Sequence, residues 1–516
     1  MAKSLMIQGT GSGAGKSLLV AALCRIFKDS GVNAAPFKAQ NMALNSYITL
    51  EGGEIGRAQA LQAEAAKIEP TVDMNPILLK ASGEAGSQVI IHGKVHSTMK
   101  AGEYYAFKKE AWKAVTKSFN RLSKKHELII MEGAGSPAEI NLMNVDIVNM
   151  SIAKHAKAPV ILVGDIDKGG VFASLYGTVK LIGNDSRHIK AYVINKFRGD
   201  LSILKPGLEM IHEKTGKPVI GVLPYINNID LPEEDGQALS SQRGLCPPYV
   251  IPLSEKDKKI KIVIVKLQYI SNFTDFDPFM HKPDIEIIYS RNSSEIENAD
   301  MVIIPGSKNT VKDLMFLKET SLDKSIKQAY SKGIQIMGMC GGYQMLGKKI
   351  YDPHSIESPH KEVDGLGLLN IETTFEKEKT TCRVEGDLVR SSEFGYKSSE
   401  NTKLTGYEIH MGTSSGDIGL FKLRRLSSNP SRATLCSPLI LDGSINGNCW
   451  GTYIHGIFEN DSFRRGIINS LRKQRGLPPV DSTIKYSEMK EKAIDNLADI
   501  VKQHLDMNFI NRIIGL

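Results

Sequence analysis

A single cysteine between an apolar run and a pair of glycines is the first feature of this chain that could do covalent chemistry. GIQIMGMCGGYQMLG places Cys340 after a strand-like run and before a helix that would begin near Gly342. Glycines permit unusual backbone angles, so the pattern predicts a sharp strand–turn–helix with the thiol at its apex. The start of a helix favours the thiolate, and neighbouring N–H groups could stabilise a forming oxyanion. We therefore interpret Cys340 as a nucleophile.

A thiolate nucleophile needs a group that passes a proton to the leaving amine, and histidine suits that role near neutral pH. His455 ends the strand-like run of GNCWGTYIHGIFEN and is the first candidate. His410, close to Glu408 in TGYEIHMG, is the reserve candidate. The loop IPGSKNT (304–310) could lend N–H groups to the oxyanion or to the substrate, or it could simply cap a helix.

A glycine-rich turn near the amino terminus indicates a phosphate-binding site. GTGSGAGKS (9–17) joins a predicted strand to a predicted helix, where backbone N–H groups and the helix dipole can surround phosphate oxygens. Lys16 would neutralise the terminal phosphates and Ser17 would ligate Mg²⁺. The spacing is a variant, because Gly9 and Gly15 enclose five residues and Thr10 stands where the usual first glycine lies. The predicted cradle comprises Gly9, Thr10, Gly13, Gly15, Lys16 and Ser17.

An acidic side chain should help to hold the metal. Glu132 follows the apolar run ELIIM, and ligands of open α/β sheets bind at the carboxyl ends of the strands. We predict that Glu132 ligates Mg²⁺ together with Ser17, although a cap or a solvated loop carboxylate is the alternative. Asp165 and Asp167 end another run in the same way and are second-choice ligands or substrate contacts.

Two series of α/β elements must position these groups, since strand-length apolar runs alternate with helix-period segments. In the first series the order is that of a doubly wound parallel sheet. It has predicted strands at 4–9, 127–131, 158–165, 191–196 and 218–224 and helices at 16–31 and 54–68. The second has predicted strands at 260–266, 284–290, 300–306 and 333–339 and a helix at 310–332. We expect a P-loop domain at 1–225, a linker at 226–259, a second α/β domain at 260–460 and a helical tail at 461–516.

Composition narrows the class of protein. The chain has 516 residues, enough for two cores, with 41% hydrophobic and 24% charged residues. The net charge of +8 comes without a basic block interleaved with aromatics, which disfavours nucleic acid as a partner. Apolar runs are strand-length, so no membrane segment is expected. Six cysteines without a C-x-x-C pair favour the cytoplasm, and five are interpreted as inert: Cys24, Cys246, Cys382, Cys436 and Cys449.

These motifs together carry a family resemblance. The second half resembles class I glutamine amidotransferases, and the first half resembles the dethiobiotin-synthetase-like P-loop enzymes that activate a carboxylate with ATP. In this order the chain resembles the cobyric acid synthase family of the cobalamin pathway. The resemblance rests on PFKAQNMALNS (36–46), EIGRAQALQAEAA (54–66), DMNPILLK (73–80), EGAGSPAEINL (132–142), DIVNM (146–150), GDIDKGGVFAS (165–174), NKFRGD (195–200), PGSKNT (305–310), GMCGGYQMLG (338–347), GYEIHMG (406–412) and GTYIHGIF (451–458).

The resemblance implies a reaction on small molecules. Cys340 would attack the side-chain amide of glutamine, which would form a γ-glutamyl thioester and release ammonia. ATP and Mg²⁺ would convert carboxylates of a corrin, adenosylcobyrinic acid a,c-diamide, to acyl phosphates, and ammonia would amidate its b, d, e and g positions. Lys38 is implied to contact phosphate or a substrate carboxylate, and Asn195 to face the adenine.

The chain departs from the family's sequence pattern at two positions. Many class I amidotransferases have a glutamate two residues after the histidine, but Ile457 stands there and Glu459 is four residues on, so no third member is assigned. Gly13 replaces an acidic residue common in the family's loops.

Two alternative functions compete with this one. The a,c-diamide synthases share both domains but are disfavoured by PFKAQNMALNS and NKFRGD. ATP-switched partitioning proteins carry a signature lysine where this chain has Gly11.

Overall fold

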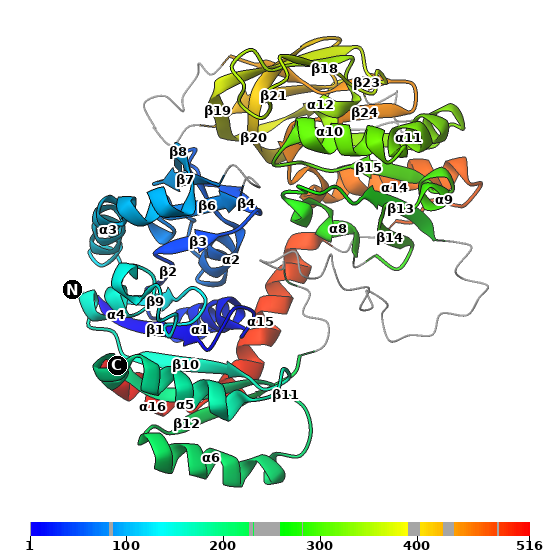
Figure 1. Cartoon of the computed structure of the whole chain (residues 1–516). Coiled ribbons are helices and arrows are strands. Elements are labelled where there is room, and N and C mark those ends of the chain that lie inside the picture. Colours follow the sequence, from blue (N-terminus) through cyan, green and yellow to red (C-terminus); the bar gives the residue numbers. More distant parts are fainter. Residues whose placement is uncertain are drawn as a thin grey trace. The chain divides into compact units, whose positions relative to one another are not determined.

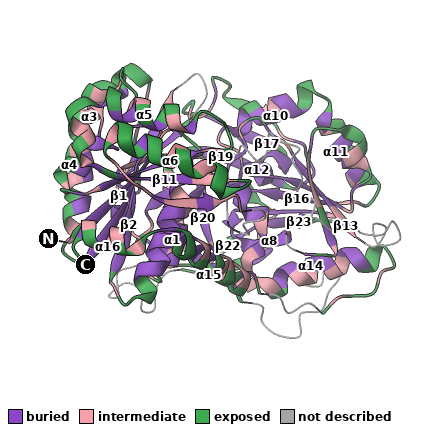
Figure 2. Cartoon of the chain, turned by 90° about the horizontal axis from the view of Figure 1, so that it is seen from below, coloured by how far each residue is buried: buried purple, intermediate pink, exposed green. Residues whose placement is uncertain are grey.

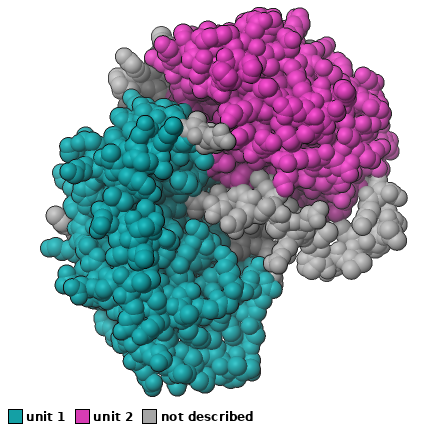
Figure 3. All heavy atoms as spheres, in the orientation of Figure 1, with its two compact units in different colours: residues 1–43, 53–232, 488–516 teal, residues 44–52, 233–487 magenta. Residues whose placement is uncertain are grey.

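The chain folds into two compact units, shown in different colours in Figure 3. The structure is a computed structural model that describes residues 2–81, 86–226, 231, 259–280, 282–390, 403–426, 438–481 and 485–516. Unit 1 comprises Met1–Ala43, Gly53–Pro232 and Glu488–Leu516, and unit 2 comprises Leu44–Gly52 and Glu233–Ser487. Almost all of the expected linker at 226–259 lies outside the described residues, as do Cys246 and Cys436.

The units divide the chain differently from the expected domains at two places. Leu44–Gly52 belongs to unit 2, although the residues on either side belong to unit 1. The expected tail at 461–516 is split, because Glu488–Leu516 returns to unit 1. The reason for the return is apolar packing: Ile494, Leu497 and Val501 are buried in the core of unit 1.

A parallel sheet with the strand order β12-β11-β10-β1-β9-β2 lies at the centre of unit 1 (Figure 1). Its strands are β1 (Lys3–Gly9), β2 (Ala34–Phe37), β9 (Leu128–Glu132), β10 (Val160–Asp165), β11 (Ile189–Phe197) and β12 (Val219–Pro224). The chain order reverses on either side of β1, which is the doubly wound arrangement expected from the sequence. Ligands of such sheets bind at the carboxyl ends of the strands near the reversal, where the glycine-rich loop begins.

Helices cover both faces of this sheet because successive strand residues point to opposite sides. Leu5 and Ile7 pack with α1, α2, α15 and α16, and Met6 packs with α3, α4, α5 and α6. These helices are α1 (Lys16–Asp29), α2 (Arg57–Ala65), α3 (Ala101–Leu122), α4 (Met150–His155), α5 (Val171–Leu181), α6 (Leu201–Thr215), α15 (Tyr486–His504) and α16 (Met507–Ile514). A smaller sheet pairs β3 (Gln40–Met42), β6 (Ile77–Ala81), β7 (Ser87–Ile91) and β8 (Lys94–Met99).

One helix of unit 1 begins later than the sequence predicted. The segment expected to be helical from residue 54 starts as β5 (Glu54–Gly56), and α2 begins only at Arg57. The backbone N–H of Glu54 donates to Gly93 O, and that of Gly56 donates to Asn75 Oδ1. These tertiary hydrogen bonds hold the segment extended and override its helical pattern.

Unit 2 contains a second mostly parallel sheet with the order β14-β13-β15-β16-β24-β23. Its strands are β13 (Ile260–Val265), β14 (Ile285–Ser290), β15 (Met301–Ile304), β16 (Gln335–Met339), β23 (Ser444–Asn446) and β24 (Cys449–Thr452). Its helices are α8 (Asp277–Met280), α9 (Ser293–Glu297), α10 (Thr310–Glu319), α11 (Leu322–Ser331), α12 (Gly341–Leu346) and α14 (Asp461–Gln474). The single helix expected at 310–332 is therefore two helices, because Ser321 adopts a left-handed conformation with φ of 58°.

A further sheet, mainly antiparallel, completes unit 2. It contains β17 (Lys349–Tyr351), β18 (Glu362–Asp364), β19 (Ile371–Leu388), β20 (Lys403–Gly416), β21 (Phe421–Arg425), β22 (Ile440–Asp442) and β25 (Ile454–His455). The short strand β4 (Ser46–Ile48) lies beside β19 and β20. Figure 2 shows central strands of both units, such as β1 and β16, as buried and the outward turns of helices such as α3 as exposed. Among the described helices, none is long and apolar enough to cross a membrane.

Candidate active site

Cys340 occupies the sharp turn between β16 and α12. Its φ of 51° and ψ of −108° are uncommon for a residue with a side chain, and such conformations concentrate at functional sites. Its N–H donates to Thr452 O over 2.9 Å, which fixes the turn to the neighbouring strand. The turn also needs glycine, because a Cβ on Gly342 would lie 1.9 Å from Ile304 O. The cysteine is buried, with 8% of its surface exposed.

His455 reaches the same edge of the sheet from the adjacent strand. β16 and β24 pair in parallel, with Met339 beside Thr452, so Cys340 and the residues after Thr452 leave the sheet at the same carboxyl edge. The loop after β15 lies against both groups: a Cβ on Gly306 would be 3.5 Å from His455 Cε1, and one on Gly341 would be 3.0 Å from Ser307 N. This position suits the suggestion that the loop supplies N–H groups to an oxyanion.

Asp275 holds the histidine. Its Oδ2 lies 2.7 Å from His455 Nδ1, and its Oδ1 accepts the Gly456 N–H over 2.8 Å. Burial opposes a charged imidazole, but the Asp275 carboxylate and the Cys340 thiol outweigh it and raise the pKa of His455 to about 10. The histidine therefore carries a proton at neutral pH that it can deliver to a leaving amine.

Reasoning from the sequence missed Asp275. It lies in the 3-10 helix η6 (Phe273–Phe276), 180 residues before His455, whereas the family pattern directs attention to positions just after the histidine. Asp275, rather than Glu459, occupies the place beside Nδ1. One signal in the sequence could have indicated Asp275. It lies in SNFTDFDPF (271–279), soon after the predicted strand at 260–266, and side chains that follow a strand of a parallel sheet can reach the carboxyl edge of that sheet.

His410, the reserve candidate, lies in a different polar network. Its ring stacks on Tyr453 with centroids 3.9 Å apart, and its Nδ1 lies 2.9 Å from Gly412 O. Its Nε2 is 3.5 Å from Glu408 Oε1, and Glu408 also accepts a 2.7 Å bond from Arg425. Burial alone would raise the pKa of Glu408, but His410 and Arg425 lower it to about 2. The structure thus brings Cys340 together with His455 and pairs His410 with a carboxylate.

The glycine-rich loop follows the central strand β1 and leads into α1. Gly13 and Gly15 have φ of 72° and 94°, values that glycine adopts without strain. Lys16 Nζ donates to Gly11 O over 2.9 Å and to Gly135 O over 3.3 Å, so its ammonium lies within the loop. The loop leads directly into the amino end of the 14-residue α1 at Gly15, an arrangement that suits a phosphate chain.

Asn195 lies against this loop from β11. Its Nδ2 donates to Ala14 O over 2.9 Å, and a Cβ on Gly15 would fall 2.1 Å from that nitrogen. Lys196, which the sequence did not single out, donates to Gly13 O over 2.7 Å and to Asp165 Oδ2 over 2.8 Å. Where the family's loops carry an acid, this chain therefore has a backbone carbonyl bound by a lysine.

Glu132, the last residue of β9, is hydrogen-bonded to two other predicted site residues of unit 1, Ser17 and Lys38. Its Oε1 accepts from Ser17 Oγ and from Lys38 Nζ, each over 2.8 Å, and its Oε2 accepts from Gln62 Nε2 over 2.6 Å. The Ser17 hydroxyl and the Glu132 carboxylate are thus adjacent oxygen atoms, and both are of the kind that binds a magnesium ion beside a P-loop. Gln62 is a further member that sequence reasoning missed.

The second-choice acids are engaged with cations. Asp165 pairs with Lys196, and Asp167 lies 3.3 Å from Arg198. Within the described ranges, no group of three or more histidine, cysteine or acidic side chains is arranged to hold a metal. A magnesium ion at a P-loop draws most of its ligands from phosphate and water, so Ser17 and Glu132 alone suit it.

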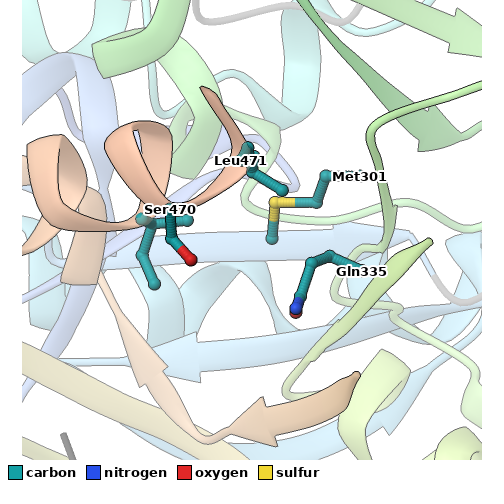
Figure 4. A pocket seen from close by; sticks show the side chains of 5 residues that line it. Met301, Gln335, Ser470 and Leu471 are labelled. Carbon is teal, nitrogen blue, oxygen red and sulfur yellow. The ribbon is translucent and has the colours of Figure 1, made fainter. Parts of the chain in front are cut away.

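Unit 2 also contains a small hollow (Figure 4). It is lined by Met301, Gln335, Ile467, Ser470 and Leu471. Met301 and Gln335 are the first residues of β15 and β16 and pair with each other in register, whereas Cys340 follows the last residue of β16. The hollow therefore lies at the opposite edge of the sheet from the nucleophile.

Each half of the chain matches the model of a known domain family. Residues 5–239 match the model of the CobQ/CobB/MinD/ParA nucleotide binding domain, and residues 261–463 match that of the CobB/CobQ-like glutamine amidotransferase domain. The chain is 49% identical to a cobyric acid synthase of Thermodesulfovibrio yellowstonii over the full length of both chains. It is 48% identical to one of Thermoanaerobacter sp., covering 99% of each chain, and 47% identical to one of Dehalococcoides mccartyi, covering 100% of this chain and 99% of that one.

Proposed function

The chain belongs to the cobyric acid synthase family, and on that premise we propose that it amidates the b, d, e and g carboxylates of adenosylcobyrinic acid a,c-diamide. Glutamine donates the nitrogen and ATP supplies the energy. The observation that carries the proposal is the Cys340–His455–Asp275 arrangement in the same chain as a P-loop with an adjacent carboxylate. A glutaminase alone would not need the second site.

The first half-reaction releases ammonia. The Cys340 thiolate attacks the side-chain amide carbon of glutamine, and the N–H groups around Gly341 and Ser307 stabilise the oxyanion. His455 gives its proton to the departing nitrogen, which leaves a γ-glutamyl thioester. The imidazole, now neutral, takes a proton from water, and the water hydrolyses the thioester to glutamate. Asp275 keeps the ring oriented through both proton transfers.

The second half-reaction prepares the acceptor. A carboxylate is a poor electrophile until phosphate becomes its leaving group, so the γ-phosphoryl group of ATP is transferred to the corrin carboxylate and ammonia then displaces phosphate. Lys16 would neutralise the phosphates, Asn195 would face the adenine, and Lys38 would contact phosphate or the substrate carboxylate. Ser17 and Glu132 would hold Mg²⁺, which neutralises phosphate charge when bound. The free thiols among the described cysteines suit the cytoplasmic setting that we propose.

The test is to incubate the purified protein with ATP, glutamine and either cobyrinic acid or its a,c-diamide, and to count added amides by mass. We expect four additions to the a,c-diamide. Amidation of cobyrinic acid alone would indicate an a,c-diamide synthase instead. Hydrolysis of ATP without release of glutamate would favour a partitioning-type P-loop protein.

A further inference from the structure

A segment from the first half of the sequence is built into the glutaminase unit. Residues 44–52, here called the strap, belong to unit 2, while Ala43 and Gly53 belong to unit 1. Backbone bonds hold the two ends in unit 1: Ala43 N–H donates to Leu79 O over 3.2 Å, and Glu54 N–H donates to Gly93 O over 3.0 Å. Within the strap, Ser46 is fully buried.

Ser46 binds two residues that flank the histidine. Its N–H donates to Asn272 Oδ1 over 2.9 Å, and its carbonyl accepts the Tyr407 hydroxyl over 3.2 Å. Asn272 Nδ2 lies 3.5 Å from His455 Nδ1, and the Tyr407 ring stacks on the imidazole with centroids 5.3 Å apart and planes 16° apart. A single strap residue thus contacts both neighbours of His455.

The bond from Ser46 decides which way the Asn272 amide faces. An N–H donor needs the carbonyl oxygen of the amide, so Nδ2 is turned toward the imidazole. An amide turned the other way would present an acceptor to Nδ1–H and would compete with Asp275 for the same proton. Ser46 therefore protects the pairing of His455 with Asp275.

The rest of the strap is fixed to β19. Arg383 Nε donates to Ile48 O over 3.0 Å, and Thr381 Oγ1 donates to Gly52 O over 2.8 Å. The Arg383 guanidinium also lies over the Tyr47 ring, 5.0 Å from its centroid. Ile48 packs with Tyr407 and Ile409 in a small apolar cluster. Contacts of Tyr47, Ile48 and Gly52 with unit 2 therefore help to fix the position of Ser46.

We propose that the strap is a positioning element of the glutaminase site, in which Ser46 holds Asn272 and Tyr407 against His455. This inference rests on the proposed function, because it assigns His455 to glutamine hydrolysis. It means that ammonia release depends on a segment inserted, in sequence, between two strands of the nucleotide-binding unit. Ser46, Asn272 and Tyr407 position the histidine and take no direct part in the making or breaking of bonds.

The test compares Tyr407→Phe and Ser46→Pro with wild type in the full-length chain. Tyr407→Phe keeps the stacked ring and removes only the hydroxyl, and Ser46→Pro removes the N–H that orients Asn272. Tyr351→Phe is the matched control, because it removes a hydroxyl that bonds Glu372 over 3.3 Å at an exposed position. The readouts are kcat and KM for glutamate release, amide formation with ammonia, and the pH dependence of Cys340 alkylation by iodoacetamide, followed on the Cys340 peptide.

We expect Tyr407→Phe to lower kcat about three- to tenfold, the effect of one hydrogen bond, with KM unchanged. Ser46→Pro should lower kcat further, and both variants should alkylate Cys340 more slowly than wild type at neutral pH. Amide formation from ammonia should be unaffected, which shows that the nucleotide-binding unit of both variants folds. Tyr407→Phe leaves the backbone of unit 2 unchanged and therefore decides the inference if Ser46→Pro disturbs the folding of that unit. Wild-type kcat and wild-type alkylation in Tyr407→Phe would overturn the inference. If wild type released no glutamate, the proposed function would fail, and the alkylation profiles would still decide whether the strap positions His455.

Discussion

Asp275 Oδ2 lies 2.7 Å from His455 Nδ1, although the two residues are 180 positions apart in the sequence. The same carboxylate accepts the Gly456 N–H, so both of its oxygens are bound at the histidine turn. An imidazole held in this way keeps one ring orientation and keeps its proton. The arrangement supplies the third member that Ile457 and Glu459 do not.

Replacing Asp275 by asparagine should remove the charge and keep the shape. We expect Asp275→Asn to lower kcat for glutamate release at least about a hundredfold, since proton transfer by His455 contributes about that much and depends on the orientation and charge that Asp275 maintains. Amide formation from ammonia should persist, because the P-loop site is untouched. Glu459→Gln serves as the control and should stay within about twofold of wild type. Steady-state assays of both reactions check this, and a larger loss in Glu459→Gln than in Asp275→Asn would contradict it.

The pH dependence of glutamate release should report on His455. Burial lowers its pKa, but Asp275 outweighs burial and raises it to about 10. In the proposed mechanism the protonated imidazole donates to the leaving nitrogen, so activity should be retained through neutral pH and lost as the pH rises through that value. In Asp275→Asn the loss should occur at lower pH, since burial then acts without the neighbouring charge. Profiles of kcat over KM in both proteins test this, and coincident alkaline limbs would refute it.

The glycine-rich loop should tolerate a methyl group at one glycine and not at another. A Cβ on Gly15 would fall 2.1 Å from Asn195 Nδ2, and its φ of 94° is strained for alanine. Gly15→Ala should therefore raise the Kd for ATP at least about tenfold. A Cβ on Gly11 would meet no atom within 4 Å, so Gly11→Ala should bind within about twofold of wild type. Calorimetric titration with ATP distinguishes the two, and equal affinities would show that this contact is not limiting.

Local patterns predicted the elements that position each site. The strand before Cys340, the glycine-rich turn before Lys16 and the acid ending β9 all come from continuous stretches, in which apolar runs and glycines determine structure. Groups that depend on distant segments were not predictable in this way. Asp275, the position of Ser46 in unit 2 and the return of residues 488–516 to unit 1 result from tertiary packing, which leaves no periodic signal in the sequence.

The return of the C-terminal helices has a stability consequence. Leu497 in α15 is 4% exposed and packs in the core of unit 1 behind the P-loop sheet. Leu497→Ala should destabilise unit 1 by about 2–4 kcal/mol, the cost of removing a buried leucine side chain. Leu516→Ala, at a position that is 48% exposed, should change stability by less than about 0.5 kcal/mol. Urea unfolding followed through ATP binding checks this, and equal stabilities of the two variants would place residues 488–516 outside that core.

The most direct test of the two-site account is the mass of the corrin product formed by Cys340→Ala with each nitrogen source. We predict that this variant, given ATP and the a,c-diamide, forms no amide from glutamine and the full set of amides from ammonia. Lys16→Ala should form none from either source, because the carboxylates are not activated. Loss of amide formation from both sources in Cys340→Ala would contradict the division of labour between the thiol and the P-loop.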